Sequence, residues 1–407
     1  MGPTGARRHK PDYWLFVLMC LLLAVGLVVI YSISPGLAAS QHISQSYFIS
    51  KQLLDVGLGL AIFAVAAFTP VRQWLRLTNI VVLAAVFFSV LVLFTPVDEF
   101  YRAHRWIRLG GFSFQVAELI KLALILWLAK FLTDRWRAGQ LSDTKQTLRP
   151  LLVLLVLIAI MVMKLQSDLG SAGVMVAILA IMAFSMGIGL KRLALIVGVI
   201  ALVLSLAVAT SSYRRDRLAS YLNPGKDCKD SSYQVCQALI SVGSGGLFGQ
   251  GLGYGVQAYG YLPESSNDSI FAIIAEKFGF VGTAAIVVIY GVFFTRLKKI
   301  IERTSDHFSR LLVVGVLAWI STQMIINVGA MIGLLPLKGI TLPLISQGGT
   351  SLLFLTAALG IVFQISRYTN YSVTEPNISS ETAGNYRFNG RRVRRAHNSA
   401  LTARPRT

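Results

Sequence analysis

The chain has 407 residues, of which 55% are hydrophobic and 14% charged, and its formal net charge is +20. A soluble domain cannot bury so large an apolar share, and continuous apolar runs of about 20 residues indicate transmembrane helices rather than the alternating strands of a membrane barrel. The basic residues gather in loops and in the C-terminal tail, which is typical of membrane orientation and disfavours a nucleic-acid-binding protein.

Ten apolar segments are predicted to cross the membrane as helices. They are residues 12–33, 49–69, 78–95, 115–133, 150–166, 168–189, 193–212, 269–295, 308–334 and 348–366. If the N-terminus lies inside the cell, 25 of the 38 Lys and Arg residues fall on the cytoplasmic side, which the positive-inside tendency favours. The sequence therefore predicts an all-α, polytopic integral membrane protein of about ten helices with both termini in the cytoplasm.

Three regions are expected along the chain: a cytoplasmic N-tail at 1–11, a membrane domain at 12–367 and a basic tail at 368–407. The basic tail is polar and Arg-rich, which is typical of disorder, and contact with anionic lipid is one role open to it. The largest extracytoplasmic loop, residues 213–268, joins spans seven and eight. Its apolar and aromatic content favours short helices folded back on the membrane. Cys228 and Cys236 share this loop, so an oxidising compartment would permit a disulfide between them.

Charged side chains inside apolar segments are costly in a bilayer, so each one needs a physical reason. Glu118 and Lys121 are three residues apart on one helix face, where they can pair. Further charges lie within or beside spans five, six and eight: Lys164, Asp168, Glu276 and Lys277. Two interpretations stay open for this set, namely buried ion pairs that position helices or a polar cavity reached from outside the cell.

Arginines gather on the predicted outer face, where positive-inside statistics disfavour them. They are Arg102, Arg105, Arg108, Arg214, Arg215 and Arg217. Guanidinium groups bind phosphate oxygens in a bidentate manner. The acidic stretch "LPESSND", with Glu264 and Asp268, lies on the same face. We therefore expect a phosphate-bearing ligand in the outer leaflet, with pairing to ordinary lipid head groups as the alternative.

Five stretches of the chain resemble the signature blocks of the SEDS family (shape, elongation, division and sporulation), in the family order. They are "HRWIRLGGFSFQVAELIK", "LQSDLGSAG", "YQVCQALISVGSGGLFGQGLG", "YLPESSNDSIFAIIAEKFGFVG" and "GLLPLKGITLPLISQGGTS". The resemblance covers about residues 12–367. In the last block, Lys338 before Gly339 is more similar to the division member FtsW than to the elongation member RodA.

The resemblance implies a peptidoglycan glycosyltransferase that polymerises lipid II at the outer face of the bacterial cytoplasmic membrane, at the division septum. Implied partners are lipid II, undecaprenyl-pyrophosphate-linked glycan, a class B penicillin-binding transpeptidase similar to FtsI, other divisome proteins and membrane lipids. No organic cofactor is expected, and a divalent cation, Mg or Mn, is a candidate. Three alternatives stay open: a scaffold that recruits a transpeptidase, a lipid II flippase, and a RodA-like elongation role.

The family's functional positions map onto this chain block by block. Its essential aspartate falls on Asp268, which the resemblance makes a general base or a metal ligand, with N-capping of span eight as the structural alternative. The hypothesis for pyrophosphate binding includes Arg105, Arg214, Arg217 and Lys338, with Glu264 in support. Supporting polar positions are Gln115, Glu118, Lys121, Lys164, Asp168 and Glu276. The chain departs from the family most at Lys277, where a second glutamate is usual, and the added positive charge is expected to disturb Glu276 or metal binding.

Overall fold

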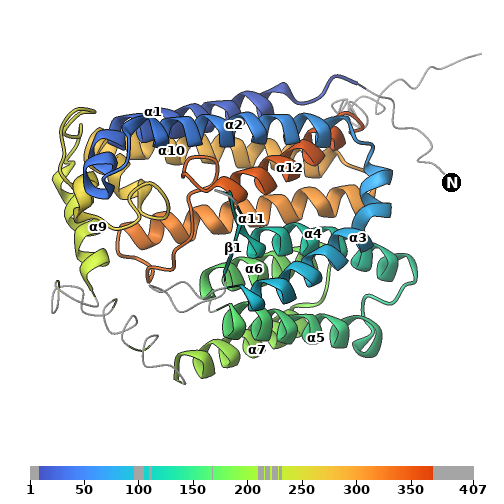
Figure 1. Cartoon of the computed structure of the whole chain (residues 1–407). Coiled ribbons are helices and arrows are strands. Elements are labelled where there is room, and N and C mark those ends of the chain that lie inside the picture. Colours follow the sequence, from blue (N-terminus) through green and yellow to red (C-terminus); the bar gives the residue numbers. More distant parts are fainter. Residues whose placement is uncertain are drawn as a thin grey trace, which may run out of the picture. The chain divides into compact units, whose positions relative to one another are not determined.

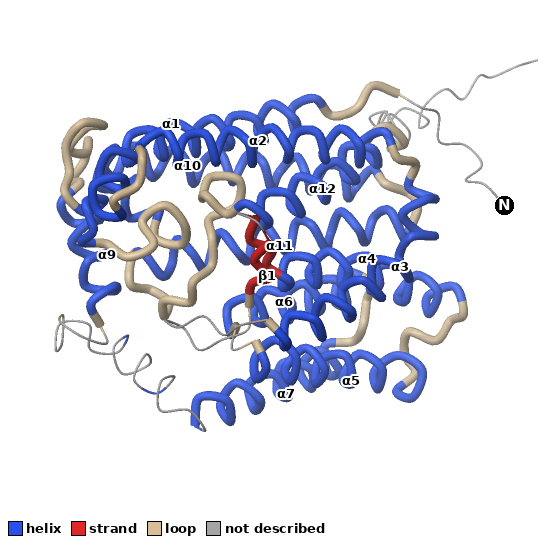
Figure 2. The backbone as a smooth tube through the Cα atoms, in the orientation of Figure 1, coloured by secondary structure: helices blue, strands red, loops and turns tan. Residues whose placement is uncertain are grey.

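The structure is a computed structural model that describes residues 9–95, 105–109, 112–166, 168–209, 215, 221, 228 and 232–369. Helices dominate this part of the chain, and one antiparallel hairpin lies among them (Figures 1 and 2). The helices are α1 (Tyr13–Gln41), α2 (Gln45–Phe68), α3 (Val71–Leu91), α4 (Val116–Arg137), α5 (Arg149–Ile158), α6 (Leu169–Ser185), α7 (Leu190–Ala209), α9 (Tyr233–Ser244), α10 (Ile270–Arg303), α11 (His307–Met331) and α12 (Gly349–Ser366). Shorter helical turns are η1 (Val92–Phe94), η2 (Thr144–Leu148), η3 (Ala159–Leu165) and η4 (Gln257–Tyr261), and the strands are β1 (Trp106–Leu109) and β2 (Phe112–Gln115).

The ten segments predicted to cross the membrane each overlap one of the helices α1 to α7 or α10 to α12. In the described part of the chain, seven helical stretches are long and apolar enough to cross a membrane. They comprise α1, α2, α3 with η1, η2 with α5, α10, α11 and α12. An all-α integral membrane protein is thereby confirmed, whereas ten crossings, the loop and the domain boundaries stay predictions.

One difference from the predicted spans is at the end of α1. This helix continues through Pro35 to Gln41, although the sequence predicted an end at residue 33. A proline removes one backbone donor, but transmembrane helices tolerate it because neighbouring groups satisfy the freed carbonyl. At its other end α1 is capped by Asp12, whose carboxylate accepts from Trp14 N at 3.0 Å.

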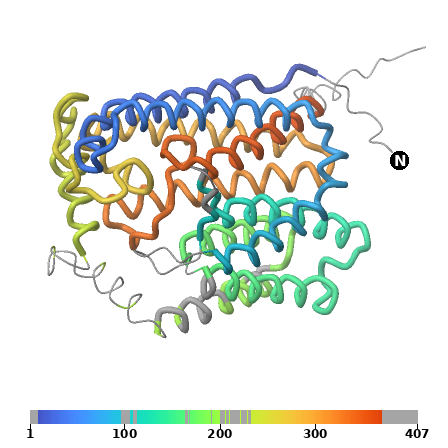
Figure 3. The backbone as a smooth tube through the Cα atoms, in the orientation of Figure 1, coloured from blue at the N-terminus to red at the C-terminus, as the bar shows by residue number. Residues whose placement is uncertain are grey.

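Helix α11 is the central element of the bundle. It packs against α4, α6 and α10, and its Trp319 is fully buried. Around it, α2 packs against both α1 and α12, so the first helices of the chain lie beside the last (Figure 3). The backbone of His9 donates to Arg367 O at 3.0 Å, which brings the two ends of the described chain to one side of the bundle.

Helix α10 is broken at Gly279, which has φ 63° and ψ −163°, a conformation that favours glycine. Residues 246–251, which follow α9, lie against the break and complete its backbone hydrogen bonds. Four bonds join the two segments: Gln250 N to Glu276 O at 2.8 Å, Gly251 N to Lys277 O at 3.0 Å, Phe280 N to Gly246 O at 2.9 Å and Val281 N to Leu247 O at 3.0 Å. The loop after α9 therefore supplies the partners that a broken membrane helix requires.

Candidate functional site

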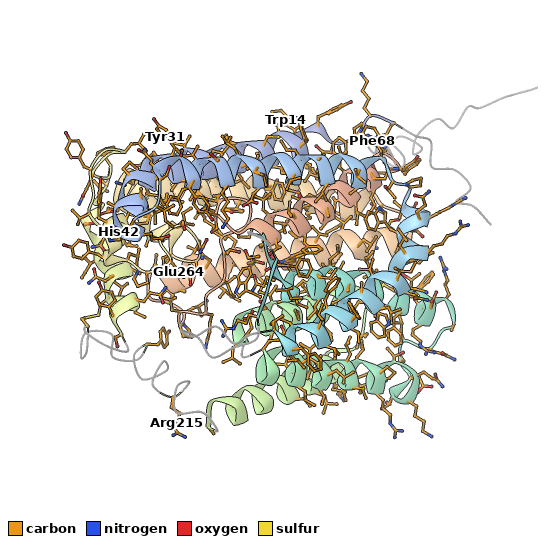
Figure 4. All side chains as sticks on the ribbon, viewed as in Figure 1. Trp14, Tyr31, His42, Phe68, Arg215 and Glu264 are labelled. Atoms are coloured by element: carbon orange, nitrogen blue, oxygen red, sulfur yellow. A yellow bond between two sulfur atoms is a disulfide. The ribbon has the colours of Figure 1, made fainter. Side chains whose placement is uncertain are left out.

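Asp268 lies in the turn that leads into α10. The turn begins at Glu264, an exposed residue with φ 52°, and Asn267 closes it by donating Nδ2 to Glu264 Oε2 at 2.6 Å. Ser269, rather than Asp268, occupies the N-cap position of α10. Asp268 is only 7% exposed and accepts from Ser269 Oγ at 3.3 Å. Glu264 lies at the same end of the bundle as His42, away from Phe68 (Figure 4).

A small pocket opens beside Asp268, between α11 and the chain that follows it. The pocket is lined by Asp268, Ile326, Asn327, Ala330, Met331, Leu337, Lys338, Gly339 and Ile340. Asn327 is 2% exposed and donates Nδ2 to Asp268 O at 2.7 Å and to Ile340 O at 2.6 Å. A Cβ atom added to Gly339 would lie 3.6 Å from Asp268 Oδ2, so the carboxylate faces this segment. The predicted base and Lys338 thus share one pocket.

The base of the β hairpin meets the start of α6 in a second polar cluster. Trp106 pairs with Gln115, so Arg105 and Gln115 emerge at the same end of the hairpin. Arg105 Nε donates to Gln166 O at 3.0 Å, and Gln115 Nε2 lies 3.5 Å from Asp168 Oδ2. Asp168 itself caps α6 by accepting from the backbone N–H of residue 171 at 2.9 Å.

The segment 338–341 connects the second cluster to the Asp268 pocket. A Cβ atom at Gly170, in the first turn of α6, would lie 2.8 Å from Lys338 O. The start of α6 therefore packs directly against the chain that lines the pocket. Sequence positions near 105, 168, 268 and 338 are in this way brought to one region of the fold.

Glu118 and Lys121 form the predicted ion pair, with Nζ 2.7 Å from Oε1. Both residues are buried, at 3% and 1% exposure. Lys121 also donates to Gln323 Oε1 at 3.1 Å, and Gln323 Nε2 donates to Thr341 O at 3.0 Å. The pair therefore ties α4 to α11 and to the pocket-lining segment, an arrangement that favours the helix-positioning interpretation over an open cavity.

Glu276 and Lys277 are not among the residues that line the Asp268 pocket. Glu276 Oε1 accepts from Val256 N at 3.0 Å and from the next backbone N–H at 3.3 Å. Lys277 Nζ donates to Tyr254 O. Both side chains hold the backbone of residues 254–257, so the positive charge of Lys277 is directed to that loop.

Several predicted site residues cannot be placed at the pocket. Arg214 and Arg217 lie outside the described residues, as do the side chains of Arg108 and Lys164. Arg215 donates to Ala209 O at 2.7 Å, at the end of α7. The structure joins Cys228 to Cys236 in a disulfide, with Cα atoms 5.7 Å apart, which anchors the start of α9.

The donor set at Asp268 limits what metal it could hold. Within the described ranges, no group of three or more His, Cys, Asp or Glu side chains is close enough to bind an ion. Asp268 is the only carboxylate among the pocket-lining residues, and the buried Oδ1 of Asn327 has no hydrogen-bond partner in the described chain. One carboxylate and one amide oxygen fit a hard divalent ion only if a phosphate ligand shares it, which is the usual manner of Mg²⁺.

Sequence reasoning missed Asn327 and Gln323. Both are buried polar residues of α11 and contact the segment 338–341. Their signal was present in "STQMIINVGAM", because uncharged polar side chains inside an apolar span also need partners. Charged residues give a stronger signal in a sequence because their transfer into lipid is more costly.

The long apolar helices make this chain an integral membrane protein. A pocket near one end of the helices contains a buried carboxylate and a lysine, so the protein has a polar site there. More particularly, the chain belongs to the FtsW/RodA/SpoVE family of cell cycle proteins, whose profile matches residues 13–371. This confirms the resemblance seen in the five sequence blocks.

Relatives and solved structures agree with this assignment. The chain is 35% identical to "Stage V sporulation protein E" of Bacillus subtilis over 90% of this chain and 99% of that one. It is 38% identical to "Probable peptidoglycan glycosyltransferase FtsW" of Thioalkalivibrio sulfidiphilus over 89% and 90%. A chain from "Structural coordination of polymerization and crosslinking by a peptidoglycan synthase complex" matches with a TM-score of 0.73 and 26% identity, over 88% of this chain and 98% of that one. RodA of Thermus thermophilus matches with a TM-score of 0.62 and 27% identity, over 88% and 98%.

Proposed function

We propose that the protein polymerises lipid II into peptidoglycan glycan strands at the outer face of the bacterial cytoplasmic membrane during cell division. Relatives named FtsW carry the name of a probable peptidoglycan glycosyltransferase, which supports this reaction. The single structural observation that supports it best is the pocket shared by Asp268 and Lys338, since the reaction needs a base beside a cation.

In the proposed reaction, Asp268 removes the proton of the 4-hydroxyl of an acceptor lipid II. The hydroxyl oxygen attacks the anomeric carbon of the growing glycan from the face opposite its pyrophosphate. One carbon–oxygen bond forms while the bond to the pyrophosphate breaks, and the leaving group keeps the electron pair. Arg105 and Lys338 hold the departing pyrophosphate through charge-assisted hydrogen bonds. Arg214 and Arg217 are proposed to join them, and Glu264 supports the turn that carries Asp268.

In the alternative in which Asp268 is a metal ligand rather than the base, Asp268 and Asn327 Oδ1 would hold a divalent cation, Mg or Mn, as a proposed cofactor. When bound, such an ion supplies positive charge that stabilises the leaving group. The supporting polar residues Gln115 and Asp168 hold the hairpin base beside the start of α6. Their proposed role is to fix Arg105 relative to the pocket.

The proposed partner is a class B penicillin-binding transpeptidase of the FtsI type, together with other divisome proteins and membrane lipids. The solved chain with a TM-score of 0.73 comes from a peptidoglycan synthase complex, which supports a partnered enzyme. We place the protein at the division septum with both termini in the cytoplasm. The distribution of Lys and Arg along the sequence supports this orientation.

The test is polymerisation by the purified full-length protein, alone and with a class B transpeptidase, given lipid II and Mg²⁺ or Mn²⁺. Glycan ladders are expected from the parent and from Glu302→Ala, an exposed control on α10, and no ladders from Asp268→Ala. Ladders of parental length from Asp268→Ala would refute the catalytic role. Complementation of a division-depleted strain by Asp268→Ala would indicate a scaffold, and undiminished lipid II flipping by Asp268→Asn would indicate a flippase.

A further inference from the structure

Residues 251–262 form a strap that links α9 to the turn carrying Asp268. On one side, the strap is held by two adjacent residues of α10, Glu276 and Lys277, which are 1% and 3% exposed. Lys277 Nζ donates to Tyr254 O, and Glu276 Oε1 accepts from the backbone N–H of Val256. Acceptor and donor side chains thus act together on one short stretch of strap backbone, residues 254–256.

The fit between Glu276 and the strap is tight. Gly255, between the two held positions, has φ 101°, and a Cβ atom there would lie 2.7 Å from the carboxylate carbon of Glu276. The carboxylate therefore rests against bare backbone. A side chain at this position would displace it.

The other side of the strap packs on α1. A Cβ atom at Gly36 would lie 3.0 Å from Ala258 O, and one at Gly260 would lie 3.3 Å from Ser40. Ala258 and Leu262 are both 2% exposed. The strap is therefore fixed between α1 and α10, and its end continues through Pro263 into the turn at 264–268.

Lys277 is not among the residues that line the Asp268 pocket. It is the eighth residue of α10, so it lies about 10 Å along the helix axis from the start of that helix, at 1.5 Å per residue. Its ammonium group is moreover directed to a strap carbonyl. A carboxylate at this position, which the resemblance makes usual, could not donate to that carbonyl.

We propose that Lys277 is a positioning residue, which holds the strap so that the turn at 264–268 presents Asp268 to its pocket. This inference rests on the proposed polymerase function for its effect on rate. It also reverses the expectation that Lys277 disturbs the site. The ammonium group of Lys277 donates to the strap carbonyl Tyr254 O, a hydrogen bond that the carboxylate of Glu276 cannot make.

The test compares Lys277→Met with Lys298→Met, the same change at a lysine of α10 whose side chain is 72% exposed. Hydrogen exchange is followed by mass spectrometry on the full-length protein in lipid nanodiscs. Lys277→Met should speed exchange within 254–262 by about ten- to hundredfold, the factor expected from losing a hydrogen bond to a charged group. It should also lower kcat for lipid II polymerisation while leaving KM equal to that of Lys298→Met. Lys277→Arg should restore kcat, and Lys277→Leu replaces the Met variant if that variant does not fold.

The outcomes separate the two proposals. If the parent makes no glycan, the polymerase function is wrong, and the exchange data still decide whether Lys277 holds the strap. If the parent is active and Lys277→Met exchanges and polymerises as Lys298→Met does, the positioning role is wrong. A loss of kcat with unchanged strap exchange would also overturn it, since the effect would then not pass through the strap.

Discussion

The buried pair of Glu118 and Lys121 allows a quantitative prediction for Lys121→Met. The pair is 2.7 Å apart and both residues are at most 3% exposed, while Glu118 Oε2 already has no hydrogen-bond partner in the described chain. Removal of the ammonium leaves an unpaired carboxylate inside the bundle and deprives Gln323 Oε1 of a donor. Breaking a buried ion pair in this way is expected to lower the free energy of unfolding by about 3–5 kcal/mol.

The measurement is reversible unfolding of the purified protein in mixed micelles, by titration with sodium dodecyl sulfate. The control is Lys298→Met, which breaks an exposed pair with Glu302 at 3.8 Å and should cost less than about 1 kcal/mol. Addition of Glu118→Gln to Lys121→Met should recover much of the loss, because the stranded charge is gone. The reasoning fails if Lys121→Met is no more destabilising than Lys298→Met, or if the double variant is worse than the single one.

Three further predictions concern packing, the disulfide and the pocket. Gly26→Ala should destabilise the fold by about 1–3 kcal/mol, because the added Cβ would lie 2.5 Å from Ile345 O. Gly57→Ala should leave the stability unchanged, because there is open space around Gly57, and the same micelle titration compares the two variants. Iodoacetamide should label Cys20 alone among the three cysteines in unfolded, unreduced protein, and mass spectrometry that finds three labels would exclude the disulfide. Asn327→Leu removes the two hydrogen bonds that hold Asp268 O and Ile340 O, so it should lower kcat for glycan synthesis at least tenfold. A kcat equal to that of the parent would show that these bonds do not position the base.

The sequence predicted the positions of ten helices because each lies in a long apolar run, while ten membrane crossings stay a prediction. It also predicted that Glu118 and Lys121 pair, since residues three apart on a helix share a face. Helix ends were less predictable: α1 continues past Pro35 because its ending depends on neighbours in space rather than on the local sequence. The hairpin of β1 and β2 was not predicted; it lies between the predicted spans 78–95 and 115–133 apart from its last residue, and four-residue strands give little periodic signal.

The residue types of the candidate site were predictable from the sequence, but the contacts that bring them together were not. The resemblance pointed to Asp268, and the structure shows that Lys338 lines its pocket. The partners of Glu276 and Lys277 could not be read from the sequence, because both contact backbone atoms about 20 residues earlier in the chain. A sequence pattern identifies side chains by their chemistry, whereas nearly every residue has the same backbone carbonyl and amide. A contact to the backbone therefore leaves no mark in the sequence.

The break at Gly279 divides α10 into a short and a long part, which are expected to form at different stages of synthesis and folding. Residues 280–303 are about 36 Å long as a helix, enough to cross the hydrocarbon core of a bilayer without help. Residues 270–278 are about 13 Å long and reach their full complement of backbone hydrogen bonds only when 246–251 are docked. During synthesis the long part can enter the membrane as an ordinary apolar segment, whereas the end that carries the site is completed by tertiary folding afterwards. Substitutions in "GGLFGQ", residues 245–250, would therefore impair the folding of α10, although this helix begins about twenty residues later in the chain.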